Sequence, residues 1–251
     1  MQKMGGGVFD LKRISVALET NGRGFIGFIA QLPGAYVRGE TDEITLSKVH
    51  TEVRSYARWL AVEAPVGYEN SVSQRHHCTL MVEDADTEIL LDEDRSPMND
   101  EEFKELHDLA ACSGETIYAL CKNADLRDWV DESRVRKTFY GETPKTIREI
   151  FDHVNGTQYY YLSRANLTTK ERAGDLLEAR HDCLSCLQEL FEQQDNDRIF
   201  VVDNEEWTLR KILRRFVWHD RIHAKSIVRI MQKQKQLGLI VSFEDPFHFV
   251  T

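Results

Sequence analysis

Long apolar runs are absent from this sequence of 251 residues. No stretch approaches the roughly 20 consecutive apolar residues that a membrane-spanning helix needs, and the first residues lack the short apolar core of a signal peptide. With 41% hydrophobic and 29% charged residues, the chain has the composition of a globular protein with a buried core. We therefore expect no membrane association and a cytoplasmic location.

Cysteine is scarce: the chain has five cysteines, which is an odd number, and their spacing is irregular. A small fold held by disulfides needs paired, densely placed cysteines, so this pattern excludes such a framework and predicts free thiols in a reducing compartment. Cys183 and Cys186 stand at C-x-x-C spacing, but a zinc knuckle needs a second such pair. We interpret these two as core residues of one helix.

An excess of positive charge is also missing. The formal net charge of −10 disfavours binding to nucleic acid, because such binding needs a basic surface. Basic residues dominate only between Trp207 and Lys235. The simplest interpretation of this segment is a helix side that faces solvent or a partner, and the alternative is a surface that binds anions.

The N-terminal part has the hydrophobic pattern of a small sheet with one helix. The pattern predicts strands at residues 14–18, 25–31 and 35–38, a helix over residues 42–61 and a further strand over residues 76–84. Asn21 and Gly22 favour a hairpin between the first two strands, because both residue types tolerate positive φ. Thr41 is the expected N-cap of the helix, which Asp42 and Glu43 then open.

Residues 28–53, "FIAQLPGAYVRGETDEITLSKVHTEV", resemble the HicB-like antitoxin fold. The signature of that family is a strand that enters a "PGxxxxG" turn, followed by Thr and acidic residues at a helix start. The resemblance implies a HicB-like domain over residues 1–86 and a protein partner for it. Antitoxins of this type reach DNA through an added module, for which the sequence has no spare segment, so no direct contact with nucleic acid is expected.

Helical patterns fill the rest of the chain. The first helix is expected to begin at Asn99 or Asp100, and the second at Thr143, with Pro144 in the first helical position. Two more helices are expected over residues 173–194 and 208–235. Four amphipathic helices predict a four-helix bundle over residues 87–251. The expected fold class is thus α+β, with a β-β-β-α-β domain followed by an all-α bundle.

Two histidines stand on the apolar stripe of the last expected helix. His219 and His223 are four residues apart, a spacing that places both rings on one helix face and lets them converge on one metal ion. His153 shares the apolar stripe of the second helix and is the candidate third ligand. A divalent metal would satisfy all three imidazoles. The alternative is three core or half-exposed histidines that bond to carbonyls and water.

The same histidines carry a resemblance to the DinB-like (YfiT-like) metalloproteins over about residues 88–231. Members hold a metal with one histidine on the second helix and a His-x-x-x-His pair on the last, which match His153 in "TIREIFDHVNGTQYYYLSR" and His219 with His223 in "WTLRKILRRFVWHDRIHAKSI". The resemblance implies zinc, nickel or iron at these histidines, and a homodimer. Many members have Gln where this chain has Lys225, so the surroundings of the metal differ.

The family includes thiol S-transferases and an isomerase, so the resemblance implies a divalent-metal-dependent enzyme, of transferase or hydrolase type, that acts on a small molecule. No catalytic residue follows from the sequence. Asp152, Asp220, Tyr160 and Tyr161 lie near the histidines in sequence; Asp220 is expected to face solvent and the tyrosines to pack. The alternatives are a structural metal in an assembly subunit and a non-catalytic binding or regulatory protein whose HicB-like domain docks a protein partner.

Overall fold

The computed structural model describes residues 12–138, 141–169, 174–193 and 197–250. They form two compact units, and the class is mixed α+β, as the sequence predicts. The first unit comprises Met1–Glu93 together with Pro246–Thr251, and the second comprises Asp94–Asp245. Within the described residues, no helix has both the length and the apolar character needed to cross a membrane.

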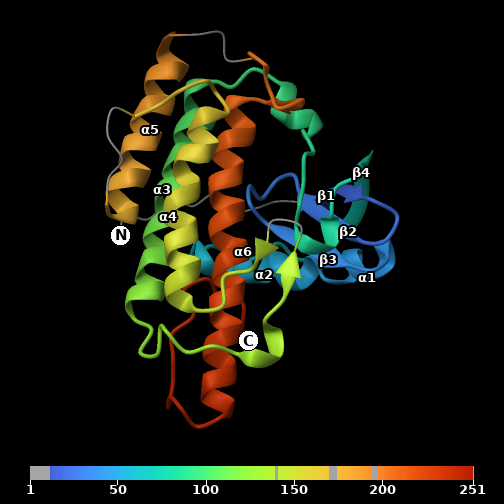
Figure 1. Ribbon diagram of the computed structural model, residues 1–251. Helices are drawn as coiled ribbons and strands as arrows, with labels where there is room; N and C mark the ends of the chain where they lie inside the picture. The colour runs from blue at the N-terminus through green and yellow to red at the C-terminus, as the bar shows by residue number, and fades with distance from the viewer. Residues whose placement is uncertain (1–11, 139–140, 170–173, 194–196, 251) are drawn as a thin grey trace. The chain divides into compact units, whose positions relative to one another are not determined.

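The first unit contains a four-stranded sheet (Figure 1). Its strands are β1 (Arg13–Thr20), β2 (Phe25–Ile29), β3 (Tyr36–Gly39) and β4 (Glu69–His77), in the order β3-β2-β1-β4. The pairs β1–β2 and β2–β3 are antiparallel, whereas β1 and β4 are parallel. The hairpin predicted at Asn21 is confirmed: its side-chain oxygen accepts hydrogen bonds from the backbone of Arg23 and Gly24, and Gly22 has a φ of 83°.

Two short helices replace the single helix predicted over residues 42–61. Helix α1 (Asp42–Ser47) begins at Thr41, whose hydroxyl accepts a hydrogen bond from the backbone N–H of Ile44 as predicted. The chain then bends at Lys48 and continues as α2 (Val49–Trp59). Helix α2 turns Val49, Val53 and Tyr56 into the core of the unit, as its apolar spacing predicts.

The predicted strand over residues 76–84 is wrong in position. Strand β4 ends at His77, and Val82–Asp84 form a short 3-10 helix, η1, with Val82 buried. The apolar residues before Glu83 favour a strand, but in the structure Val82 anchors a helical turn in the core. The real strand, "ENSVSQRHH", lies at the edge of the sheet and lacks apolar alternation, so its periodicity does not reveal it.

The second unit is built around four long helices that run side by side (Figure 1). They are α3 (Asp100–Lys122), α4 (Ile147–Ser163), α5 (Leu176–Gln193) and α6 (Leu209–Gln236). Helices α5 and α6 each pack against both α3 and α4. The connection before α4 holds η3 (Glu132–Arg134) and the pair β5 (Lys137–Thr138) and β6 (Gly141–Glu142), and the hairpin of β7 (Phe200–Val202) and β8 (Glu205–Trp207) precedes α6.

The N-caps of α3 and α4 can be compared with those expected from the sequence. Asn99 caps α3 through a capping box with Glu102, as predicted, and Thr208 caps α6. The predicted start of α4 at Thr143 is wrong, because Thr146 caps this helix by accepting a hydrogen bond from the backbone of Glu149 at 3.0 Å. Thr143 instead donates its hydroxyl hydrogen bond to the carbonyl of Arg136.

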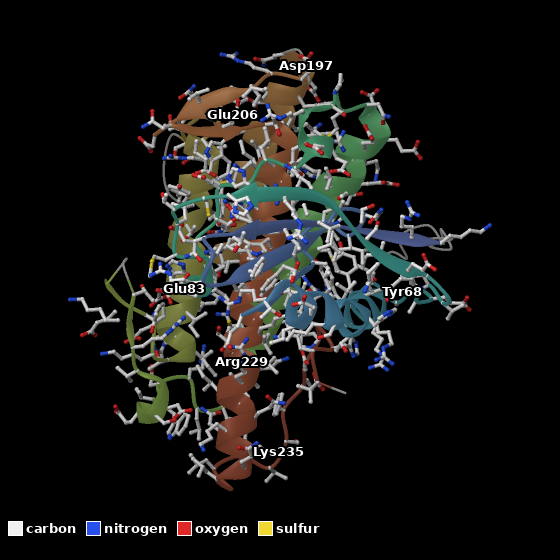
Figure 2. All side chains as sticks on the ribbon, turned by 90° about the vertical axis from the view of Figure 1, so that its right-hand side faces the viewer. Tyr68, Glu83, Asp197, Glu206, Arg229 and Lys235 are labelled. Atoms are coloured by element: carbon white, nitrogen blue, oxygen red, sulfur yellow. The ribbon has the colours of Figure 1, made fainter. Side chains whose placement is uncertain are left out.

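The interpretation of the basic segment as a solvated or partner-facing helix side is wrong for its first half. Lys211, Arg214, Arg215 and Arg221 are buried. Lys211 donates to the carboxylate of Glu205 at 2.8 Å, and Arg214 forms an ion pair with buried Asp94. In the second half of α6, Arg229 and Lys235 are exposed, and Figure 2 shows them toward the end of this helix that lies away from Glu206.

Candidate metal centre

The three histidines singled out in the sequence lie together in the structure. His153 projects from α4, and His219 and His223 project from successive turns of α6. The ring nitrogens Nε2 of His153 and His219 are 3.2 Å apart, and one nitrogen from each of the three rings lies within 4.8 Å of the others. The ring centroids of His219 and His223 are 4.4 Å apart, and that of His153 lies 5.1 and 4.7 Å from them.

This spacing fits one metal ion. With a metal–nitrogen distance of about 2.0–2.1 Å, two ligand nitrogens lie about 2.9 Å apart at a right angle and about 3.4 Å apart at the tetrahedral angle. The 3.2 Å between the nitrogens of His153 and His219 falls inside that interval. The same distance also fits a direct hydrogen bond in which one ring donates to the other. The geometry therefore permits a metal without requiring one.

The histidines are unequally buried. His219 is buried, His223 is partly buried and His153 is exposed. The sequence predicts that His153 points inward with the apolar stripe of α4, and Ile150 and Val154 on that stripe are indeed buried. His153 as a residue is exposed, but its ring is partly buried, with its Nε2 3.2 Å from Nε2 of His219. A ligand bound by the three rings would thus lie near the surface of the unit.

Burial keeps these rings neutral at pH 7. Burial lowers the pKa of His153, and burial together with His153 lowers the pKa of His223 to about 3. The pKa of His219 falls well below its usual range through burial and then through the other two rings and the nearby Arg180 and Arg215. Neutral imidazole is the form that binds metal ions, so the site needs no large deprotonation step at neutral pH.

The lowered pKa of His223 predicts acid sensitivity of the metal-free protein. As the pH falls below about 6.5, the unfolded chain takes up a proton at His223, whereas the folded chain stays neutral there until the pH approaches 3. The free energy of unfolding should therefore fall with decreasing pH, by up to about 1.4 kcal/mol per pH unit from this one group.

Urea unfolding of EDTA-treated protein between pH 7 and pH 5 would measure that slope. His223→Leu should show a shallower slope than the wild type, whereas His181→Ala, which removes an exposed histidine of α5, should leave it unchanged. Equal slopes in wild type and His223→Leu would contradict the prediction.

A buried ion pair lies beside the histidines. Asp220 follows His219 on α6 and is fully buried, so its predicted position facing solvent is wrong. Its carboxylate accepts hydrogen bonds from the two terminal nitrogens of Arg180 on α5, at 2.9 and 3.0 Å, and from the hydroxyl of Ser113 on α3, at 2.6 Å. These bonds fix the turn of α6 that carries His219 to two neighbouring helices.

Arg180 extends this network to the fourth helix. Its Nε donates to the side-chain oxygen of Gln158 on α4 at 2.6 Å, and its Nη1 also donates to the carbonyl of Ala110. Gln158 lies just over one turn beyond His153 on α4, so the network ties together the two helices that carry the histidines. Arg180, Gln158 and Ser113 are not among the residues predicted from the sequence. A charged residue within the apolar stripe of α5, between Leu176 and Cys183, was the available signal.

The remaining sequence candidates have lesser roles. Tyr161 is buried, and its ring lies 5.6 Å from that of His219 and 5.4 Å from that of Phe216, so it packs beside the site as predicted. Tyr160 is 45% exposed and its ring contacts the guanidinium of Arg164, while Asp152 is exposed. Of these three, Tyr161 is the one with a recorded contact to a site histidine.

The cysteines do not add ligands to this centre. All five are free thiols. Cys183 is buried in α5, and burial raises its pKa to about 12, as expected for a core thiol. Cys186 is half-buried one turn later.

Comparison with protein-family models, with curated proteins and with solved structures finds no match for this chain.

Proposed function

We propose that the second unit is a DinB-like four-helix bundle that binds one divalent metal ion through His153, His219 and His223. The observation that carries the proposal is the convergence of three neutral imidazoles from two helices, with two of their nitrogens 3.2 Å apart. The helix order and the pairing of α5 and α6 with both α3 and α4 support the same architecture.

The donor set suits zinc, nickel or iron. Imidazole nitrogen is a common ligand of all three metals, whereas magnesium and calcium prefer oxygen. Three protein ligands leave at least one coordination position for water or a substrate, the arrangement found in catalytic rather than structural zinc sites. Because His153 is exposed, such a position would lie near solvent.

These features support a metal-dependent enzyme of transferase or hydrolase type that acts on a small molecule. A bound divalent metal would supply Lewis acidity, which lowers the pKa of a water or thiol that coordinates it. Neighbouring residues hold His219 in place: Asp220, Arg180 and Ser113 fix the α6 turn that carries it, and Tyr161 packs against its ring. None of these side chains is assigned a proton-transfer role.

A second candidate function is a non-catalytic binding or regulatory protein. The observation that favours it is the sheet of the first unit, whose strand order leaves β3 and β4 at its edges among the described residues. An edge strand can pair with an extended segment of another protein. In this view the first unit is a HicB-like domain that docks a protein partner, and any metal at the histidines is structural.

Elemental analysis tests the metal proposal directly. Protein purified without a histidine tag should contain about one zinc, nickel or iron ion per chain more than the variant that combines His219→Ala with His223→Ala, because that variant has lost two of the three ligands. The matched control is His181→Ala, which should keep its metal. Circular dichroism would establish that each variant is folded. Wild-type protein that takes up no metal from zinc or nickel solutions would contradict the proposal.

A further inference from the structure

A second group of metal-binding side chains lies in the first unit. Glu19 belongs to β1, Cys78 directly follows β4, and Glu88 belongs to the segment after η1. One ligand atom from each of the three side chains lies within 4.8 Å of the others. This group shares no residue with the three histidines of the second unit.

The parallel pairing of β1 and β4 brings these residues together. Glu19 lies opposite His76, and Thr20 lies opposite His77, in the register of the two strands. Paired residues of neighbouring strands point to the same face of a sheet, so Glu19 and His76 share one face. Side chains along a strand alternate between the faces, so Cys78, two residues after His76, is expected on that face as well. The ladder continues to Cys78, whose backbone N–H donates to the carbonyl of Thr20 at 3.0 Å.

The third residue comes from a segment that crosses this face. Gln74 on β4 donates to the carbonyl of Leu90 at 2.9 Å, which holds the segment against the strand. Nε2 of His76 lies 3.1 Å from a carboxylate oxygen of Glu88 and fixes the direction of that side chain. The contacts made by Gln74 and His76 therefore help to place Glu88 over the ends of β1 and β4.

Hydrogen bonds fix the orientation of the Glu19 carboxylate. Its side chain is fully buried, and its Oε1 accepts hydrogen bonds from the backbone N–H groups of Glu88 and Ile89 at 2.9 and 3.2 Å. Its Oε2 accepts one from the hydroxyl of Thr87. The Cys78 thiol also hydrogen-bonds to this carboxylate, so a metal ion bound here would take the place of the thiol proton. Hydrogen bonds of this kind commonly orient carboxylates that bind metals.

We propose that Glu19, Cys78 and Glu88 form a binding site for a divalent cation, with zinc as the best-suited metal, and that His76 positions Glu88. Zinc accepts thiolate and carboxylate ligands together in four-coordinate sites, whereas magnesium and calcium favour ligand sets made of oxygen alone. Cys78 and Glu88 are half-buried, so water can take the fourth position.

The charges of the group fit a cation. Burial, together with the neighbouring carboxylates of Glu19 and Glu88, raises the pKa of the Cys78 thiol to about 11, so the thiol keeps its proton at neutral pH when no cation is bound. Binding of zinc forms a sulfur–zinc bond, breaks the sulfur–hydrogen bond and releases one proton to solvent. The bound cation would also offset the negative charge of the two carboxylates.

Cobalt(II) titration of the full chain under reducing conditions tests the proposal. Cobalt takes the place of zinc in such sites, and a thiolate ligand gives a charge-transfer absorption in the near ultraviolet. The three-histidine centre has no sulfur ligand and cannot give this band, so the outcome is independent of the proposed function. We expect a band that saturates at about one cobalt per chain beyond any taken up by the histidines, and that zinc abolishes by displacement.

Variants assign the band to this site. Cys78→Ser should lose it, whereas Cys186→Ser, which removes another half-buried thiol, should keep it. Glu88→Gln keeps the thiol and should weaken cobalt binding by about tenfold or more, because it removes one ligand charge. Absence of the band from the wild-type protein, or its persistence in Cys78→Ser, would overturn the proposal. Circular dichroism would establish folding, and the weaker cobalt binding expected of Glu88→Gln decides the case if Cys78→Ser does not fold.

Discussion

Zinc is expected to stabilise the second unit strongly, and His153→Ala should remove most of that effect. Binding to the folded state alone adds about 4 kcal/mol to the free energy of unfolding when free metal reaches one thousand times the dissociation constant. His153 is exposed, so its replacement should cost little stability in the absence of metal. Its loss leaves only His219 and His223 to bind the ion.

Thermal unfolding with and without zinc would measure this difference. The wild type and His181→Ala should both show a large upward shift in Tm, and His153→Ala should show little. Zinc bound by Glu19, Cys78 and Glu88 could also raise Tm, so the same comparison is made in a Cys78→Ser background. An equal zinc-induced shift in His153→Ala and the wild type would show that the histidines do not hold the ion.

Arg180→Met is expected to destabilise the second unit by about 3–5 kcal/mol, because it leaves the carboxylate of Asp220 buried without its cation. Arg180 and Asp220 are both buried, and Arg180 also bonds to Gln158 and Ala110, so one substitution removes interactions with three helices. Chemical unfolding followed by circular dichroism would measure the change.

A double variant separates the loss of charge balance from the loss of packing. Arg180→Met combined with Asp220→Leu removes both charges, and Ser113 can still donate to the carbonyl of Ala110, which its hydroxyl already contacts at 3.1 Å. We expect the double variant to be more stable than Arg180→Met alone. A double variant less stable than the single one would contradict this, because it would show that the unpaired Asp220 carboxylate costs less than its replacement by leucine.

Features fixed by short-range chemistry could be predicted from the sequence. Thr41 caps its helix as the sequence predicts, and Asn99 is one of the two caps expected for α3, since a cap involves residues only three positions apart. The error at the start of α4 was avoidable, because Thr146 and Glu149 stand at the spacing of a capping box, whereas Thr143 has no acidic or amide residue at the same distance.

Features that depend on distant partners could not be predicted in the same way. A buried arginine is stable only beside an acid, and the acid that pairs with Arg214 is Asp94, 120 residues earlier in the chain. Likewise, β4 is a strand because β1 offers it a parallel edge. Helical periodicity made the pairing of His219 and His223 predictable, whereas His153 meets them from an exposed position beside the apolar stripe to which the sequence assigns it. Whether they hold a metal stays a prediction.

The first unit contains residues that precede the second unit in the sequence and residues that follow it. Phe247 is fully buried in it, its ring packs against that of Trp59, and its carbonyl accepts a hydrogen bond from the hydroxyl of Ser55 at 3.0 Å. A ribosome synthesises the sheet first, but it makes Phe247 only after all of Asp94–Asp245. During synthesis Trp59 therefore lacks its contact with Phe247 until the whole second unit has been made. The second unit can thus complete its folding before the first unit does.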